Sequence, residues 1–390
     1  MIRVLFLTNS ARLTGGATIA LINLITKLKS KGCTIFVVNP ETGGFVDFLN
    51  GNCIDNAVIE YPPMDIYPYV STFGSFMKFP FRLIRNKIKS LTSFNKLSLL
   101  VEDFRPDIIH TNVGPLFIGS KVAKKYGIPH CWHIREFAES IGVRINPSLT
   151  YYKYLLKDPN NHCICITKEV FKHYQLDINK DYVVYDGVLD TEDDVFFNYP
   201  KKDYILFVGY LSDNKGIRIL LSEYANYYLG GGRLKLWLAG DSNKSYLENC
   251  KDYVSKLNIS NQVSFLGPRN DVYSLMRESK MVIVPSYSEG FSFVVAEAMF
   301  NETIVLGRNI GGIKEQFDNC FFETDEELAY RFNYDYEISS YISIIDSLPY
   351  DEYVHKTKLA KSVVKKLYNK DNQANVVLSI YKNILSNRYV

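Results

Sequence analysis

The chain has 390 residues, of which 47% are hydrophobic and 22% are charged. This mixture is typical of a folded globular protein and excludes a disordered chain, and the length predicts two or three domains. The 45 basic and 42 acidic side chains leave a net charge of +3, too small to indicate a nucleic-acid-binding protein. Because no apolar run approaches the roughly 20 residues of a membrane span, we expect a cytoplasmic protein, either free or peripheral on the inner face of a membrane.

The first half of the chain alternates short apolar runs with amphipathic segments. We expect strands at 2–7, 34–39, 107–112, 130–134, 162–167 and 182–185. A helix follows the glycines Gly15 and Gly16, and its apolar residues repeat at helical spacing until Gly32 ends it. Strands rich in valine and isoleucine that alternate with helices predict a parallel sheet covered on both faces.

The second half repeats this pattern after an acidic stretch at 188–203, which we interpret as a linker. Further strands are expected at 204–208, 234–238, 263–266, 281–284 and 303–306. The sequence beyond about residue 325 is predicted to be wholly helical. The seven cysteines include no Cys-x-x-Cys pair, so we expect buried, reduced thiols.

The predicted fold class is therefore α/β, with two doubly wound Rossmann-like domains that face a cleft, followed by C-terminal helices. We expect an N-terminal domain at 1–198 and a C-terminal domain at 199–370. The last segment, 371–390, is predicted to be a helix that can pack back on the N-terminal domain.

Ligands of open parallel sheets bind beyond the carboxyl ends of the strands, so the residues that follow strands are the candidates for chemistry. Gly15 and Gly16 lie at a strand-to-helix turn, where backbone amides can approach an anion. The alternative is that the two glycines only allow the chain to form a tight turn. Lys215 stands at a helix start and suits a diphosphate, unless it is only a solvated surface charge. No G-x-G-x-x-G or P-loop pattern occurs, which argues against NAD and P-loop ATP chemistry.

The segment 285–299 carries two glutamates in unequal surroundings. Glu289 is expected at the mouth of a helix, beside the free amides of the three residues that follow it. Glu297 lies two turns further on among apolar residues, where a carboxylate is costly unless it meets donors such as sugar hydroxyls. The alternative is that Glu289 only caps the helix and Glu297 faces solvent.

This segment resembles the signature of retaining glycosyltransferase family 4, in which seven residues separate two glutamates. That family has the GT-B fold of the glycogen synthase/phosphorylase-like superfamily. The similarity covers nearly the whole chain in the family's order. Beyond Gly15-Gly16 and the glutamates, the pieces are VVYDGVLD at 183–190, FVGYLSDNKG at 207–216, LAGD at 238–241, VSFLG at 263–267 and the glycine pair at 311–312.

The resemblance implies that the N-terminal domain at 1–198 lies on the acceptor side and that the C-terminal domain at 199–370 binds the nucleotide sugar. It also implies a role for each matching position. Glu289 would contact hydroxyls of the donor sugar, Glu297 the ribose and Lys215 the diphosphate. The whole donor-binding set that we expect is Gly15, Gly16, Gly209, Lys215, Arg218, Gly290, Phe291, Ser292 and Glu297, with Glu289 and His133 as catalytic residues.

His133 matches the family histidine near the reacting carbon, and it opens a His133-Ile-Arg135-Glu136 run. Because strand side chains alternate, His133 and Arg135 point to the same face at the strand's carboxyl end. The resemblance suggests that Arg135 and Glu136 orient the acceptor. The alternative is that His133 is an ordinary core histidine.

Three positions depart from the family pattern. Tyr210 replaces an arginine that contacts phosphate, a role that Arg218 could take over, and Asp186 replaces the asparagine of an Asn-Gly turn. The glycine and proline that usually follow the second glutamate are missing at 298–302. These departures affect the details of donor binding and leave both glutamates in place.

The resemblance implies a retaining hexosyltransferase that moves a hexose from a nucleotide-diphosphate sugar to a hydroxyl of a glycan or lipid-linked acceptor, in bacterial O-antigen or capsule biosynthesis. No resident cofactor and no metal are expected, because no Asp-x-Asp occurs and cations and amides can stabilise the departing diphosphate. The alternatives are an inactive nucleotide-sugar-binding regulator or scaffold and a GT-B-fold epimerase; a phosphorylase would need a pyridoxal cofactor and a longer chain.

Residues 76–100 interleave basic and aromatic side chains, and no acid occurs between Asp65 and Glu102. Such a segment suits an anionic membrane surface. The alternative is a solvated helix whose apolar side packs in the N-terminal domain. A nucleic-acid partner is not expected, since no binding motif accompanies the charge.

Overall fold

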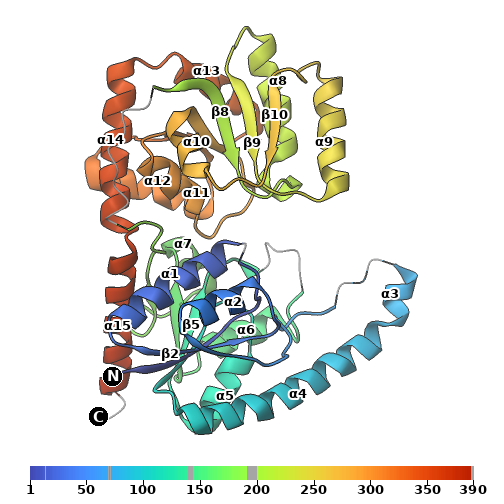
Figure 1. The fold of residues 1–390 in the computed structure, drawn as a ribbon, viewed down its shortest axis with the longest axis vertical. Helices are drawn as coiled ribbons and strands as arrows, with labels where there is room; N and C mark the ends of the chain where they lie inside the picture. Colours follow the sequence, from blue (N-terminus) through green and yellow to red (C-terminus); the bar gives the residue numbers. More distant parts are fainter. Residues whose placement is uncertain (14, 69, 71, 139–143, 191–199, 388–390) are drawn as a thin grey trace. The chain divides into compact units, whose positions relative to one another are not determined.

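The computed structural model describes the chain except for residues 14, 69, 71, 139–143, 191–199 and 388–390. It divides into two compact units, Met1–Gly187 with Lys370–Val390, and Val188–Asn369. Each unit is a parallel sheet with interleaved helices (Figure 1), which confirms the predicted α/β fold with two doubly wound domains. The predicted linker at 188–203 lies partly outside the described residues, and its end already belongs to a strand that begins at Lys202.

The first unit contains a parallel sheet of seven described strands in the order β3-β2-β1-β4-β5-β6-β7. The strands are β1 (Arg3–Leu7), β2 (Thr34–Asn39), β3 (Asp55–Val58), β4 (Ile108–Thr111), β5 (His130–Ile134), β6 (Asn161–Cys165) and β7 (Tyr182–Val183). The helices are α1 (Gly16–Ser30), α2 (Gly44–Gly51), α3 (Phe73–Met77), α4 (Phe79–Phe104), α5 (Ile118–Tyr126), α6 (Leu149–Leu156), α7 (Lys168–Tyr174) and α15 (Lys370–Ser386).

The core of this unit explains its pattern of apolar residues. Four consecutive residues of β1, from Val4 to Leu7, are completely buried, as expected of a strand with helices on both faces. The C-terminal helix α15 packs beside α1 and adds Val377, Ile380 and Tyr381 to the same core. The last helix of the chain thus completes the first unit.

The second unit contains a parallel sheet of six described strands in the order β10-β9-β8-β11-β12-β13. The strands are β8 (Lys202–Val208), β9 (Lys235–Ala239), β10 (Val263–Gly267), β11 (Ser279–Val284), β12 (Ile304–Arg308) and β13 (Tyr330–Phe332). The helices are α8 (Ile217–Leu229), α9 (Lys244–Lys256), α10 (Val272–Glu278), α11 (Phe293–Phe300), α12 (Gly311–Thr324), α13 (Ile338–Asp346) and α14 (Tyr350–Leu367), with short 3-10 helices at η3 (Asp213–Lys215) and η4 (Asp335–Glu337).

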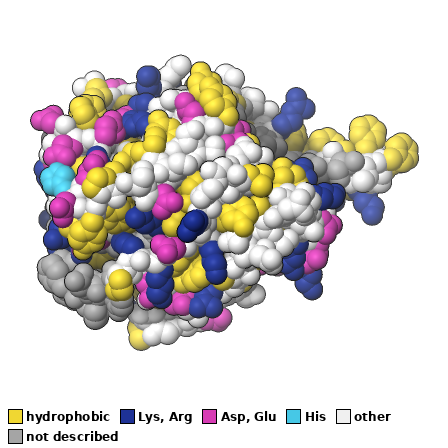
Figure 2. All heavy atoms as spheres, turned by 90° about the horizontal axis from the view of Figure 1, so that it is seen from above, with side chains coloured by type: hydrophobic (Ala, Val, Ile, Leu, Met, Phe, Trp, Pro, Cys, Tyr) yellow, Lys and Arg dark blue, Asp and Glu magenta, His cyan; other side chains and the backbone are white. Residues whose placement is uncertain are grey.

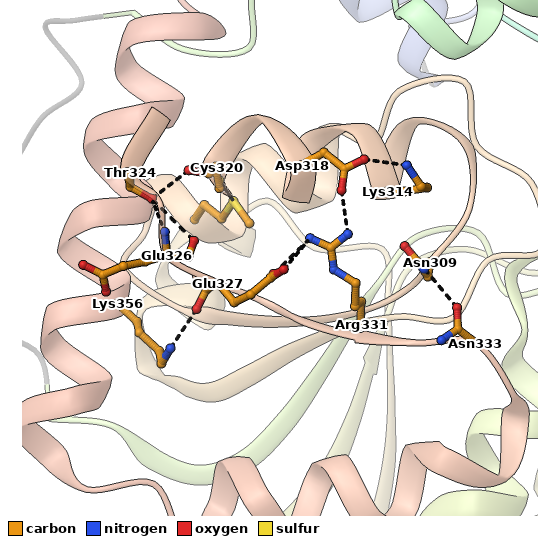
Figure 3. Close-up of polar contacts among 11 residues, drawn as sticks. Asn309, Lys314, Asp318, Cys320, Thr324, Glu326, Glu327, Arg331, Asn333 and Lys356 are labelled. Carbon is orange, nitrogen blue, oxygen red and sulfur yellow. Dashed lines mark hydrogen bonds and ion pairs between the residues drawn. The ribbon is translucent and has the colours of Figure 1, made fainter. Parts of the chain in front are cut away.

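Strand β13 shows that the prediction of a wholly helical chain after about residue 325 is wrong. This edge strand has three residues, and polar contacts hold its middle in place. Arg331 binds Asp318 of α12 at 2.6 Å and Glu327 at 2.9 Å, as Figure 3 shows. Because Arg331 separates Tyr330 from the buried Phe332, this three-residue strand leaves no apolar run in the sequence.

Helix α4 is the longest element in Figure 1 and has two different halves. Near its C-terminal end, Leu97, Val101 and Phe104 are buried against the sheet. The N-terminal half and α3 extend away from the unit, and Figure 2 shows hydrophobic and basic side chains together at the end of this projection. Within the described ranges, no helix has both the length and the apolar character needed to cross a bilayer.

The seven cysteines are all free thiols, as expected. Six of them are buried, whereas Cys53 is exposed, because it follows the end of α2 in a surface turn with φ of 51°. The expectation of burial is therefore wrong for that one thiol.

Candidate active site

The second unit brings Lys215 and Glu289 together. Lys215 ends η3, just beyond β8, and Glu289 lies between β11 and α11. Their side chains form an ion pair while remaining 32% and 16% exposed, so both can still reach a ligand. Gly216 makes this approach possible, because its φ is 72° and a Cβ there would lie 2.3 Å from the carbonyl oxygen of Pro285.

The segment that follows Glu289 is fixed from behind by α12. The amide of Gly312 donates to the Glu289 carbonyl at 2.9 Å, and a Cβ on Gly312 would lie 2.3 Å from the Gly290 carbonyl oxygen. Gln316, on the same helix, accepts from the amide of Ser292 at 3.1 Å and donates to its carbonyl at 2.9 Å. The first two turns of α12 thus set the backbone course of residues 289–292.

These contacts correct one expectation and one alternative. The amide of Ser292 is bound to Gln316, so the expectation that it is free for a ligand is wrong. Ser292 Oγ accepts from the amide of Val295 at 3.3 Å and caps α11, so Glu289 is not the capping residue. The buried Phe291 packs edge-on against Tyr368, with ring centroids 5.1 Å apart.

Glu297 lies on α11 and is half-buried, so it is neither a core residue nor fully solvated. The hydroxyl of Tyr273, on α10, donates to its Oε1 at 3.5 Å, which is a long and weak contact.

The remaining residues of this unit that we expected at the donor site lie directly after β8 and at the start of α8. Gly209 follows β8 with φ of 144°, and its carbonyl would be only 1.8 Å from a Cβ on Gly240, so the segments after β8 and β9 touch through backbone. Tyr210 is exposed. The guanidinium of Arg218 lies 5.6 Å from the ring centroid of Tyr253 on α9. Arg218 thus contacts a ring, and its role at a phosphate stays a prediction.

In the first unit, Gly15 and Gly16 begin α1, directly after the loop that follows β1. Gly15 has φ of 121°, a conformation that favours glycine, and a Cβ on either residue would meet nothing within 4 Å. Both residues are exposed. The backbone here is therefore open to an approaching ligand.

His133 belongs to a cluster of buried polar side chains in the same unit. Its Nδ1 lies 3.3 Å from His110 Nε2 and 3.4 Å from Arg135 Nη2. Burial and the neighbouring Arg135 and His110 hold the pKa of His133 well below its ordinary value, so the imidazole is neutral. Its Nε2 is buried and has no hydrogen-bond partner among the described residues.

Arg135 is held inside the unit. It binds Asp186 through Nη1 at 2.6 Å, and the two side chains are only 4% and 3% exposed. Gln373 of α15 donates to the same carboxylate at 2.9 Å. Arg135 thus orients His133 from the protein interior, which does not fit the expectation that it contacts an acceptor directly.

Sequence reasoning missed two members of this cluster. His110, on β4, is bound to the Tyr381 hydroxyl at 2.6 Å, and Asp186 neutralises Arg135. In the sequence, Asp186 stands out only as a departure from the family asparagine. Asp186 could have been predicted as the partner of Arg135 from the sequence. A buried arginine at a strand end requires an acidic side chain to neutralise its charge, and Asp186 also follows a strand of the same sheet.

Glu136 follows Arg135 and has a perturbed carboxyl group. Burial raises its pKa to about 7, against the opposing effect of the Arg135 cation. Its Oε1 has no hydrogen-bond partner in the described part of the chain. A carboxyl group that titrates near neutral pH can accept or release a proton under ordinary conditions.

The chain is similar to known proteins in sequence and in fold. Residues 190–325 match the family described as glycosyl transferases group 1. An uncharacterized glycosyltransferase of Methanocaldococcus jannaschii, MJ1178, is 25% identical over 64% of this chain and 73% of its own.

Two solved structures share the fold over nearly the whole chain. A glycosyltransferase from Rickettsia africae has a TM-score of 0.77 at 19% identity, covering 99% of both chains. Anabaena Alr3699/HepE in complex with UDP has a TM-score of 0.74 at 17% identity, covering 98% of this chain and 100% of that one; the same protein has also been solved with UDP-glucose. The chain is therefore a homologue of glycosyltransferases and a transferase enzyme, with the two-domain α/β fold of the GT-B type.

Proposed function

We propose that the chain is a retaining, metal-independent glycosyltransferase of family 4, which transfers a hexose from a nucleotide-diphosphate sugar to a hydroxyl of a glycan or lipid-linked acceptor. The observation that carries this proposal is the half-exposed pair of Lys215 and Glu289 beside the amides of residues 290 and 291. The structural relative solved with UDP and with UDP-glucose supports a uridine-diphosphate sugar as the donor.

Each member of the pair has a separate role in this proposal. Lys215 compensates the diphosphate and the charge that develops as it departs, together with backbone amides. Glu289 exchanges part of its contact with Lys215 for hydroxyls of the donor sugar. No carboxylate is assigned as a nucleophile, so the acceptor attacks from the face that the diphosphate leaves, and a phosphate oxygen takes its proton.

In the first unit, we assign His133 to the donor sugar near its reacting carbon, through the unpartnered Nε2. Arg135 acts through His133 as a positioning residue, and Glu136 remains on the acceptor side. The setting that we propose is assembly of a bacterial surface polysaccharide, either O-antigen or capsule, at the cytoplasmic face.

The proposal is tested by measuring UDP release from UDP-glucose and other UDP-hexoses. Glu289→Gln and Lys215→Met should each lower the rate at least about 100-fold, because each removes a group that acts on developing charge. The matched controls are Glu278→Gln and Lys202→Met, which break an ion pair of 2.7 Å elsewhere in the same unit. Near-normal rates in both site variants would refute the site.

The two alternatives give different results with the same protein. A regulator or scaffold would be thermally stabilised by a nucleotide sugar without ever releasing the nucleotide diphosphate. An epimerase would return an isomerised nucleotide sugar. NMR analysis of the anomer formed on an acceptor decides whether configuration is retained.

We also propose that residues 76–100 bind an anionic membrane surface. On α4, four exposed apolar side chains recur at spacings of three and four residues: Phe81, Ile84, Ile88 and Leu91. At 100° per residue, the basic residues Arg82, Arg85, Lys89 and Lys96 fall on one flank of this stripe. The face of α4 that is buried in the unit carries Leu97, Val101 and Phe104, and it differs from the exposed apolar stripe. Packing inside the N-terminal domain therefore explains the buried face of α4 and leaves the exposed stripe unexplained.

Flotation with vesicles that contain anionic lipid tests this partner. Replacing the four flanking cations by glutamine should abolish recovery with lipid. The control replaces four lysines of the second unit: Lys235, Lys244, Lys251 and Lys256. Equal recovery of wild type and the α4 variant, or no recovery of wild type, would end the proposal.

A further inference from the structure

A pocket of about 490 Å³ lies in the first unit, between α4 and the loops and helices that follow strands of the sheet. That volume is in the range of small-molecule binding sites. Its lining residues are Pro62, Met64, Asp65, Ile66, Tyr67, Leu83, Asn86, Lys87, Ser90, Phe117, Lys121, Asn146, Pro147 and Tyr151.

The pocket is built where parallel sheets bind ligands. Its walls come from the segments that follow β3, β4 and β5 at their carboxyl ends, closed by α4. Asp65 joins these segments: its amide donates to the Pro115 carbonyl at 2.7 Å, and its carbonyl accepts from the amide of Asn146 at 3.0 Å. The pocket is therefore a fixed part of the fold.

The charge of the pocket favours an anion. Two lining residues are lysines, Lys87 on α4 and Lys121 on α5, and Asp65 is the one acid among them. Both lysines are exposed, and neither forms an ion pair within the described residues. Asp65 Oδ2 accepts from the amide of Phe117 at 2.6 Å, and burial raises the pKa of this carboxyl group.

The wall opposite α4 offers aromatic rings and polar groups. Tyr151 packs edge to face against the buried ring of Phe117, with centroids 5.7 Å apart, and Tyr67 donates its hydroxyl to the Pro147 carbonyl at 3.3 Å. Aromatic faces pack against the C–H faces of a sugar ring, and the side chains of Asn86 and Ser90 can bind its hydroxyls.

We propose that this pocket binds the acceptor and that the acceptor is a sugar phosphate or diphosphate, with its phosphate at Lys87 and Lys121 and its sugar ring against Tyr151. The inference rests on the proposed function, whose acceptor class it specifies. The phosphate can belong to a soluble sugar phosphate or be esterified to a lipid carrier.

The experiment measures the affinity of the full chain for glucose 1-phosphate by titration calorimetry, without any donor. The variant Lys87→Gln/Lys121→Gln should bind at least about tenfold more weakly, because it removes two charge-assisted contacts. The matched control is Lys157→Gln/Lys172→Gln, which removes two exposed lysines of the first unit that lie outside the pocket and should change affinity less than twofold. Equal losses in both variants, or no binding by wild type, would overturn the proposal.

A second variant separates the sugar from the phosphate. Tyr151→Leu should weaken binding of glucose 1-phosphate several-fold and leave binding of inorganic phosphate unchanged. Equal weakening of both ligands would overturn the placement of the sugar ring.

The source of the phosphate is decided with glucosyl phosphate esterified to a long alkyl chain in zwitterionic vesicles. Binding at least tenfold tighter than that of glucose 1-phosphate, and lost in the Lys87→Gln/Lys121→Gln variant, identifies a lipid carrier. Comparable binding of both identifies a soluble acceptor. Because these binding experiments contain no donor, their results are independent of the UDP-release assay. Normal UDP release by a protein that does not bind the sugar phosphate would reject the acceptor pocket and leave the proposed function intact.

Discussion

Each unit contains an ion pair near a predicted functional residue, and the two pairs differ in burial. Arg135 and Asp186 of the first unit are 4% and 3% exposed, whereas Lys215 and Glu289 of the second unit are 32% and 16% exposed. A buried pair depends on both partners, because a single buried charge is very costly. A half-exposed pair can exchange a partner for water or a ligand. We therefore expect the first pair to maintain structure and the second to carry out chemistry.

The largest expected effect is that of Arg135→Met. It leaves the carboxylate of Asp186 buried with Gln373 as its remaining side-chain donor, and should lower the free energy of unfolding by about 3–5 kcal/mol. Urea denaturation measures the change. The double variant Arg135→Met/Asp186→Asn should recover much of the loss, and a cost below about 1 kcal/mol for Arg135→Met would show that the pair is dispensable.

Gly312→Ala tests whether the half-exposed pair depends on rigid support. The new Cβ would meet the Gly290 carbonyl oxygen at 2.3 Å, and displacement of this segment should cost about 2 kcal/mol and weaken UDP binding. The control is Gly51→Ala at the end of α2, where a Cβ meets nothing within 4 Å. Thermal denaturation with and without UDP separates the two effects, and equal behaviour of both variants would contradict the account.

The carboxyl group of Glu136 should make stability depend on pH. Its pKa is about 7 in the folded state, whereas the ordinary pKa of a glutamate, which we take for the unfolded chain, is 4.5. Between those values only the unfolded chain gives up this proton, so the stability that the group contributes is fully present below pH 4.5 and is lost as the pH rises toward 7. Relative to wild type, Glu136→Gln should therefore gain about 2 kcal/mol between pH 5 and pH 8. Urea denaturation at both pH values measures this difference, and a constant difference would contradict it.

The smallest expected effect on stability is that of breaking the second pair. Lys215→Met and Glu289→Gln should each change the free energy of unfolding by about 1 kcal/mol or less, because partly exposed ion pairs contribute little. A double-mutant cycle in urea measures the coupling. A coupling comparable to that of Arg135 and Asp186 would remove the distinction between the two pairs.

The sequence predicts most of the fold, because most strands are apolar runs between helices. The predicted strands at 34–39 and 130–134 agree with β2 and β5 residue for residue. The strands that were missed lack such a run: β3 reads DNAV with no buried residue, and β13 is held by the ion pairs of Arg331. Periodicity detects a face that is buried over several residues, whereas β3 has no buried residue and β13 has only Phe332.

The site is less predictable than the fold. Motif spacing indicates Lys215 and Glu289 separately, whereas their contact arises from a turn in which Gly216 lies against Pro285. Spacing also cannot show that Gln316 occupies the amide of Ser292, since this depends on where α12 packs. Asp186 and Tyr381 join the His133 cluster from segments remote in sequence, and only the folded chain brings them together.

Helix α15 has a consequence for how the protein is made. A ribosome completes all strands of the first unit within 187 residues, yet the helix that supplies Tyr381 and Gln373 leaves the ribosome only after the entire second unit. Until then the nascent first unit exposes the apolar surface that α15 will cover. The unit that is synthesised first is thus the last to mature, and a stop codon just before Lys370 would damage the half of the protein that had already been translated.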